Sequence, residues 1–195
     1  MSAEEIRRQL VRGVEVLQGM VQDQALVQTV EQIAQACVDS LRAGHKILFA
    51  GNGGSAADAQ HLAGELVSRF AFDRPGLAAF ALTTDTSVLT AIGNDYGYEK
   101  AFSRQVQAVG AAGDVFIGIS TSGKSPNILA ALREARSKGI KTVGFTGAGP
   151  GADVMAPLCD LLVRVPSTET PKIQEGHIAV GHIVCLLIEK AIFRP

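Results

Sequence analysis

No cluster of basic residues occurs in this chain of 195 residues. Its 18 Lys and Arg residues stand against 19 Asp and Glu residues, which gives a formal net charge of −1 at pH 7. Proteins that bind nucleic acids usually carry a basic patch, because they must neutralise backbone phosphates. The sequence therefore predicts no nucleic-acid partner and favours a small anionic ligand held by local groups.

Cysteine is also scarce. Cys37, Cys159 and Cys185 are odd in number and far apart, so they match neither a disulfide framework nor a zinc finger. We therefore expect the reducing environment of the cytoplasm.

Export signals and long apolar runs are absent as well. Residues 1–9 carry acidic side chains and lack the apolar segment of a signal peptide. The longest apolar stretch, Ile178 to Ile188, is interrupted by Gly181 and His182 and is too short to span a bilayer. These features predict a soluble, cytoplasmic protein with no membrane partner.

The composition that is present suits one globular unit. The chain is 47% hydrophobic, which is enough for one sizeable core, and it contains no internal repeat, linker or low-complexity tract. We expect a single domain over residues 1–195, made of an N-terminal helical arm (1–43) and an α/β core (44–195).

The arm has apolar residues at helical spacing, with a break between Gly19 and Asp23 and a stop at Gly44. The positions are Ile6, Leu10, Val14, Leu17, Val27, Val30, Ile33, Ala34, Cys37 and Leu41. This pattern predicts two helices. Packing of the arm on a partner subunit and packing on its own core are both open interpretations.

The rest of the chain alternates between strand and helix patterns. Strands are expected near 46–50, 78–82, 115–119, 141–145 and 161–165, and several of them are continuous apolar runs. Such runs are typical of parallel strands covered on both faces, so we expect a doubly wound α/β sandwich. Ligands bind such sheets at the carboxyl ends of the strands, which makes each following loop a candidate site.

The first of these loops is Gly51-Asn-Gly-Gly-Ser55, which follows the strand Lys46 to Ala50. Ser55 is expected to cap the Ala-rich helix that comes next, so backbone N–H groups would face a ligand at a helix N-terminus. His61 and Glu65 are one helical turn apart and share one face of this helix. That pair suits either metal binding or acid and base catalysis.

The second loop, Ser120-Thr-Ser-Gly-Lys-Ser125, lies between a strand and the helix predicted at 128–138. Its four hydroxyl groups and a helix N-terminus favour a phosphate monoester over an ordinary turn. The segment from Gly118 to Ser125 also matches the P-loop of nucleotide hydrolases. No acidic magnesium ligand ends the next strand, however, so nucleotide binding is the less favoured hypothesis.

A third polar set interrupts the apolar C-terminal helix, for which Thr170 is the expected N-cap and Pro171 the first helical residue. Gln174 and His182 are eight residues apart, about two turns, and therefore lie roughly on one side. Buried polar groups need partners, so they should face a site or an interface. We interpret His177 as a structural or interface histidine.

Together these motifs, with Gly93-Asn94-Asp95-Tyr96, resemble the phosphoheptose isomerase family of the sugar isomerase (SIS) fold. The similarity runs nearly end to end, with four motifs in order at matching spacings. It implies an SIS-type three-layer sandwich with a five-stranded parallel sheet. It also implies a cytoplasmic homotetramer with its sites at subunit interfaces.

The resemblance implies an activity that converts D-sedoheptulose 7-phosphate to D-glycero-D-manno-heptose 7-phosphate, for lipopolysaccharide-core synthesis. Glu65 would be the base that moves a proton through an enediol, and His182 its acid/base partner. The implied substrate-binding residues are Asn52, Gly53, Gly54, Glu65, Asn94, Asp95, Ser120, Thr121, Ser122, Ser125 and Gln174.

In zinc-containing relatives a metal site corresponds to His61, Glu65, Gln174 and His182, which implies one Zn²⁺ per subunit. A zinc-bound glutamate is a poorer base, so the two roles of Glu65 compete. The alternative function is that of a non-catalytic SIS protein that binds a replication-initiator partner. That paralogue lacks the carboxylate at the position of Glu65, so the presence of Glu65 here favours an enzyme.

Overall fold

The computed structural model describes residues 2–193, so the ends of the predicted domain, residue 1 and residues 194–195, lie outside the described range. Five parallel strands form one sheet in the order β2-β1-β3-β4-β5. The strands are β1 (Ile47–Ala50), β2 (Ala79–Ala81), β3 (Val115–Ile119), β4 (Lys141–Gly147) and β5 (Leu161–Val165). The predicted doubly wound α/β fold is confirmed, and the chain reverses its direction across the sheet between β1 and β3, where ligands commonly bind.

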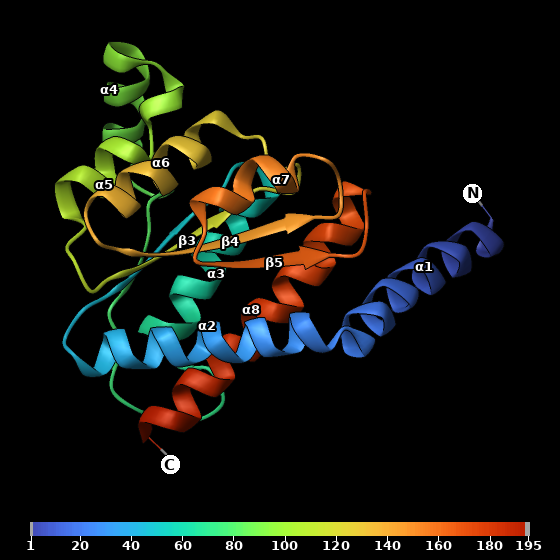
Figure 1. Ribbon diagram of the computed structural model, residues 1–195. Coiled ribbons are helices and arrows are strands. Elements are labelled where there is room, and N and C mark those ends of the chain that lie inside the picture. The colour runs from blue at the N-terminus through green and yellow to red at the C-terminus, as the bar shows by residue number, and fades with distance from the viewer. Residues whose placement is uncertain (1, 194–195) are drawn as a thin grey trace.

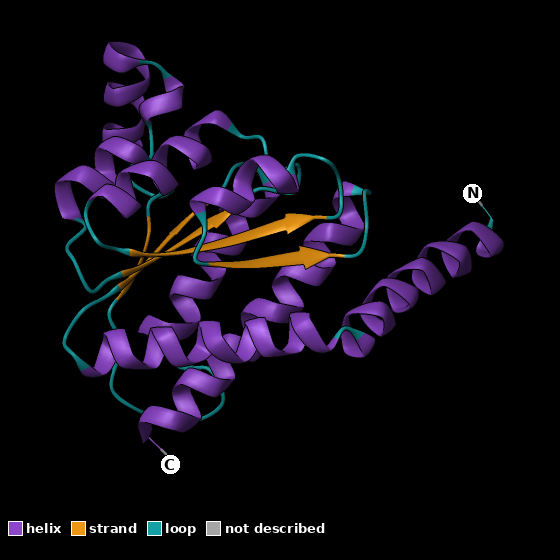
Figure 2. Cartoon of the chain, in the orientation of Figure 1, coloured by secondary structure: helices purple, strands orange, loops and turns teal. Residues whose placement is uncertain are grey.

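Helices cover both faces of the sheet (Figures 1 and 2). One face packs against α2 (Gln24–Arg42), α3 (Gly54–Val67) and α8 (Thr170–Phe193). The other packs against α5 (Ser103–Val109), α6 (Pro126–Ser137) and α7 (Ala152–Met155). Alternate residues of each strand enter the two cores: Phe49 and Ile117 point to the first, Leu48 and Phe116 to the second. This double burial explains the continuous apolar strands.

Two helices remain largely uncovered. Helix α1 (Ala3–Gln22) extends from the body (Figure 1), and of its residues only Gly13 and Met20 are buried. Its exposed apolar side chains include Ile6, Leu10, Val14 and Val21. Helix α4 (Thr86–Tyr96) has no buried residue, although it is rich in apolar side chains.

Three predicted helix starts in the core are wrong by a residue or two, and one of them is the helix predicted at 128–138, since α6 begins at Pro126. Helix α3 begins at Gly54 with Gly53 as its N-cap, so Ser55 lies inside the first turn and is buried. Gly53 has φ +56°, a conformation that favours glycine and turns the chain directly into the helix. Helix α8 begins at Thr170, which is therefore its first residue and not its N-cap.

Among residues 2–193, α8 is the one helix long and apolar enough to cross a membrane by length and composition alone. It is longer than the apolar stretch recognised in the sequence, because its first turns are amphipathic. In the fold it packs against α2 and α3, and Lys172, His177 and Glu189 are buried on it. These contacts are those of a central core helix.

The packing of α3 on α8 is close. A Cβ at Gly181 would lie 2.6 Å from Cδ2 of Leu62 in α3, so any larger residue would have to displace that side chain. A buried ion pair adds a second tie, since Arg74 Nε lies 3.0 Å from Glu189 Oε1. Arg74 also donates to the carbonyl of Glu65 (2.8 Å) and so caps the C-terminal end of α3.

Glu189 receives further hydrogen bonds from the backbone N–H groups of Phe70 (2.9 Å) and Ala71 (2.7 Å). Burial by itself raises the pKa of Glu189, but these two donors and Arg74 outweigh it, so the pKa lies below its ordinary value of 4.5. The ionised carboxylate therefore holds the segment after α3 against α8.

We expect Glu189→Gln to lower the free energy of unfolding by about 3 kcal/mol, because it leaves the buried Arg74 without its counter-ion. Urea unfolding at pH 7 measures this loss. Because the folded-state pKa is lowered, the contribution of Glu189 is complete above pH 4.5 and is lost as the pH falls through the folded-state pKa.

The matched control is Asp153→Asn, which breaks an exposed ion pair to Arg164 at the same distance of 3.0 Å. Exposed pairs contribute less than about 1 kcal/mol, so this variant should unfold nearly as the parent protein does. Equal losses in the two variants would contradict the role given to Glu189.

Candidate active site and metal centre

The glycine loop leaves β1 at the carboxyl edge of the sheet and turns sharply into α3. A Cβ at Gly51 would lie 2.3 Å from the carbonyl oxygen of Ser55, so the turn closes without room for a side chain. Asn52 is half-buried in this loop, while Gly53 and Gly54 are exposed. The loop thus presents backbone and one amide side chain to the space above β1.

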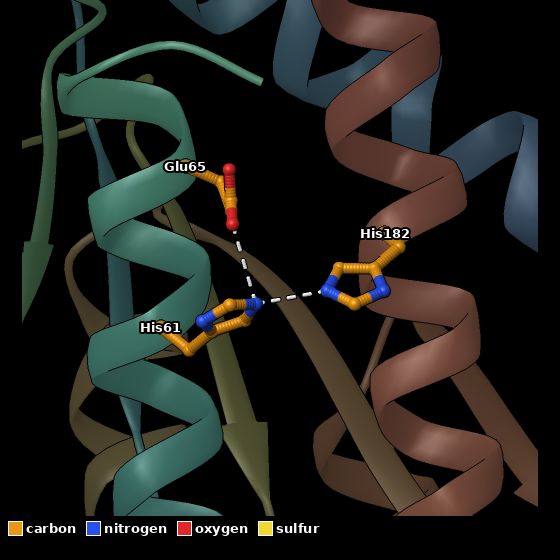
Figure 3. Close-up of side chains that lie close together, drawn as sticks. All are labelled: His61, Glu65 and His182. Atoms are coloured by element: carbon orange, nitrogen blue, oxygen red, sulfur yellow. Dashed lines mark hydrogen bonds and ion pairs between the residues drawn. The ribbon is translucent and has the colours of Figure 1, made fainter. Parts of the chain in front are cut away.

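Two helices bring three ionisable side chains together (Figure 3). His61 and Glu65 project from α3, and His182 projects from α8 toward them. The Nε2 atoms of His61 and His182 are 2.9 Å apart, and His61 Nε2 lies 3.3 Å from Glu65 Oε1. Sequence spacing predicted the α3 pair, and the fold adds His182 from 117 residues beyond Glu65.

This cluster has the composition of a zinc site. One donor atom from each of His61, Glu65 and His182 lies within 4.8 Å of the others. Ligands about 2.0–2.1 Å from a tetrahedral Zn²⁺ are separated by about 3.3 Å, so the observed spacing fits with small adjustments. Two imidazoles and a carboxylate are also a donor set that zinc accepts.

Gln174 lies beside the glycine loop, and it shares one face of α8 with His182. A Cβ at Gly54 would lie only 2.4 Å from Gln174 Nε2, which shows that the side chain rests directly on that glycine. The structure therefore places the Gln174 amide at the start of α3, and within residues 2–193 no hydrogen bond joins it to His61, Glu65 or His182.

Asp58 is a residue that the sequence reasoning missed. Its Oδ2 atom is buried without a hydrogen-bond partner in the described chain. Burial raises the pKa of Asp58, and the nearby imidazoles of His61 and His182 oppose this effect. Its position three residues before His61, on the same helical face, is the signal that would have identified it.

The hydroxyl-rich loop follows β3 and leads into α6. Ser120 Oγ lies 2.9 Å from Ser125 Oγ and 3.5 Å from Ser122 Oγ, so three hydroxyls gather in one place. Gly123 has φ +66° and packs on the backbone of Gly151. Gly118, the first residue of the P-loop match, lies inside β3, where a P-loop would already have left the strand.

The predicted substrate residues Asn94 and Asp95 lie elsewhere. They are exposed at the end of α4, where Asn94 Nδ2 donates to Asp95 Oδ1 (2.8 Å). Within residues 2–193 no hydrogen bond or ion pair joins them to either loop. Their assignment to the site remains a prediction.

Comparison with known proteins agrees with this geometry. The family model of the SIS domain matches residues 13–147. A phosphoheptose isomerase from Burkholderia pseudomallei is 65% identical over 188 residues, which cover 96% of this chain and 94% of the relative.

Solved structures agree as well. A phosphoheptose isomerase from Neisseria gonorrhoeae has a TM-score of 0.88 at 42% identity and covers 96% of this chain and 98% of its own. One from Francisella tularensis has a TM-score of 0.91 at 35% identity, with 97% and 100% covered.

The fold and the loops at its carboxyl edge define a protein of the SIS-domain class. Within that class, the chain belongs to the phosphoheptose isomerase family.

His177 lies outside this cluster, buried between α8 and β4. Its Nε2 atom is 3.1 Å from the carbonyl oxygen of Thr146, so Nε2 carries the proton, and Nδ1 has no partner in the described chain. Burial lowers the pKa of His177 to about 4 from an ordinary 6.5. This environment suits the structural role that we predicted for it.

Because the folded-state pKa is lowered, His177 destabilises the fold as it becomes protonated. Its effect is absent above pH 6.5 and grows as the pH falls toward 4, reaching on the order of 2 kcal/mol at pH 5. We expect His177→Gln to show a smaller difference in urea stability between pH 7.5 and pH 5 than the parent. If His177→Gln keeps the parent difference, the assignment is wrong.

Proposed function

We propose that this protein is an isomerase that converts D-sedoheptulose 7-phosphate to D-glycero-D-manno-heptose 7-phosphate through an enediol, for heptose and lipopolysaccharide-core synthesis. The observation that carries the proposal is the meeting of Glu65 and His182 beside His61, at the carboxyl edge of an SIS sheet. High identity to phosphoheptose isomerases supports the same substrate.

The chemistry requires a base at carbon and a proton carrier at oxygen. In the proposed reaction Glu65 removes a proton from C1 of the ketose and returns it to C2. His182 gives a proton to the oxygen on C2 as the enediol forms, and it takes a proton back from the oxygen on C1 as the aldehyde forms. The two side chains project toward one another from α3 and α8, so they can act on neighbouring atoms of one substrate.

The remaining contacts hold the substrate in this position. We assign the phosphate to the hydroxyls of Ser120, Thr121, Ser122 and Ser125. The three serine hydroxyls gather before the N-terminus of α6, which supports this assignment. The sugar oxygens are assigned to Asn52, Gly53, Gly54 and Gln174, with Asn94 and Asp95 as further contacts. An anchored phosphate aligns the reacting carbons with the base and so lowers the entropic cost of reaction.

A zinc ion is part of the proposal. His61, Glu65, Gln174 and His182 would hold it, and the three of these that carry ionisable groups have the spacing described above. When bound, it would supply positive charge that stabilises the oxygens of the enediolate.

We further propose one SIS domain per chain, with an arm (1–43) and a core (44–195), in a cytoplasmic homotetramer with sites at subunit interfaces. The exposed apolar stripe of α1 and the absence of buried residues in α4 support this assembly. Covering α4 with a second copy would also bring Asn94 and Asp95 into a protein environment.

Glu65→Gln should reduce turnover by more than about 1,000-fold, because it removes the base and keeps the size of the side chain. Formation of heptose 7-phosphate measures turnover, and calorimetry measures substrate binding, which we expect to change little. The control is Glu31→Gln, an exposed residue of α2, which should retain full activity. Retained turnover in Glu65→Gln would overturn the mechanism.

We expect purified protein to contain about one zinc per subunit, and His61→Ala or His182→Ala to lose it, since each removes one of four ligands. Elemental analysis measures this content, with His45→Ala as a control that keeps the metal. Chelated protein that retains full activity would refute a catalytic requirement for zinc, and the absence of zinc from freshly purified protein would refute the site.

A further inference from the structure

The glycine loop is joined to the helix that follows the hydroxyl-rich loop by Asn52 and by Asn127, a residue to which the proposed reaction gives no role. Asn127, the second residue of α6, is 3% exposed and faces Asn52 of the glycine loop. Asn52 Nδ2 donates to Asn127 Oδ1 (2.9 Å), and Asn127 Nδ2 donates to Asn52 Oδ1 (2.8 Å). The two amides therefore form a reciprocal pair across 75 residues of sequence.

The backbone of α6 determines which way this pair is oriented. The backbone N–H of Ile128 donates both to Asn127 Oδ1 (3.0 Å) and to the carbonyl oxygen of Ser125 (3.1 Å). A backbone N–H only donates, so the atom that receives it is the amide oxygen. Asn127 Nδ2 is then the donor toward Asn52, so the Asn52 atom that faces it must be the acceptor Oδ1.

Tyr98 completes the arrangement from η1 (Tyr98–Lys100). Its hydroxyl donates to Asn52 Oδ1 (3.1 Å), so that oxygen accepts two hydrogen bonds and has no further lone pair to offer. Asn52 Nδ2 uses one of its two hydrogens on Asn127. Among the described residues no acceptor takes the other hydrogen.

These three residues also border open space. Asn52, Tyr98 and Asn127 line a pocket of about 390 Å³ together with Ser125, whose hydroxyl belongs to the proposed phosphate site. Asn52 therefore borders a cavity that also reaches Ser125 of the proposed phosphate site.

We propose that Asn127 and Tyr98 are positioning residues that hold the amide of Asn52 so that it presents a single N–H donor to the substrate. The inference rests on the proposed function, in which Asn52 holds a sugar oxygen. The sugar oxygen must then accept a hydrogen bond from the Asn52 amide. Because Asn127 belongs to the helix that follows the phosphate loop, the same contacts set the distance between the sugar and phosphate subsites.

The test is a double-mutant cycle between Asn127 and Asn52. Asn127→Asp is nearly isosteric, but its carboxylate cannot donate to Asn52 Oδ1, and it attracts both N–H groups of the Asn52 amide. We expect KM for sedoheptulose 7-phosphate to rise about 10-fold, with kcat changed less than about 3-fold. In an Asn52→Ala background the same substitution should change KM less than about 2-fold, since the group it acts on is gone.

Tyr98→Phe removes one donor to Asn52 Oδ1 and should raise KM about 3-fold, again only when Asn52 is present. The matched control is Tyr96→Phe, since the Tyr96 hydroxyl makes no hydrogen bond within residues 2–193 and its ring lies under Arg104. Equal effects of Asn127→Asp with and without Asn52 would overturn the proposal, because a general structural defect would act in both backgrounds.

Calorimetric binding of sedoheptulose 7-phosphate to the same variants separates this inference from the proposed reaction. If the parent binds the sugar phosphate without isomerising it, the proposed activity fails, and the cycle is evaluated from the dissociation constants. Non-additive dissociation constants would then still support the positioning role, and additive ones would reject it. Failure of the parent to bind the sugar phosphate would reject both proposals.

Discussion

The close packing of α3 on α8 is the constraint on which the site depends. Gly181 lets Leu62 approach the backbone of α8, and the buried Arg74–Glu189 pair ties the segment after α3 to the same helix. His61 is next to Leu62 in the sequence, and His182 is next to Gly181. The contact that excludes water from the core therefore also sets the distance between the imidazoles.

A second constraint sets the distance between the glycine loop and the hydroxyl-rich loop. Parallel strands β1 and β3 are adjacent, so the loops that follow them leave the same edge of the sheet side by side. The amide pair between Asn52 and Asn127 joins these loops by hydrogen bonds. The proposed chemistry at Glu65 and the proposed phosphate binding at Ser125 thus lie on elements linked through the sheet, so we expect a small shift of one loop to alter the other.

Much of the fold was predictable because its signals are local. Short apolar segments, several of them continuous, predicted all five strands, and glycine and hydroxyl residues marked the loops after β1 and β3 as candidate sites. Helix starts were less accurate: Ser55 was predicted as a cap, yet the positive φ of Gly53 lets α3 begin earlier. A capping residue is recognised by type, whereas the backbone turn that precedes it depends on the packing of Gly51 on Ser55.

By itself the sequence determined which residues share a helical face and which loops share an edge, since both follow from the periods of helix and strand. It also placed His61 beside Glu65. The family resemblance implied that His182 joins them, but only the tertiary structure gave the distance between the imidazoles, the burial of His177 against Thr146 and the place of Asp58 near the imidazoles. The physical reason is that these distances depend on how two helices approach each other, and that approach is set by contacts between residues more than 100 positions apart.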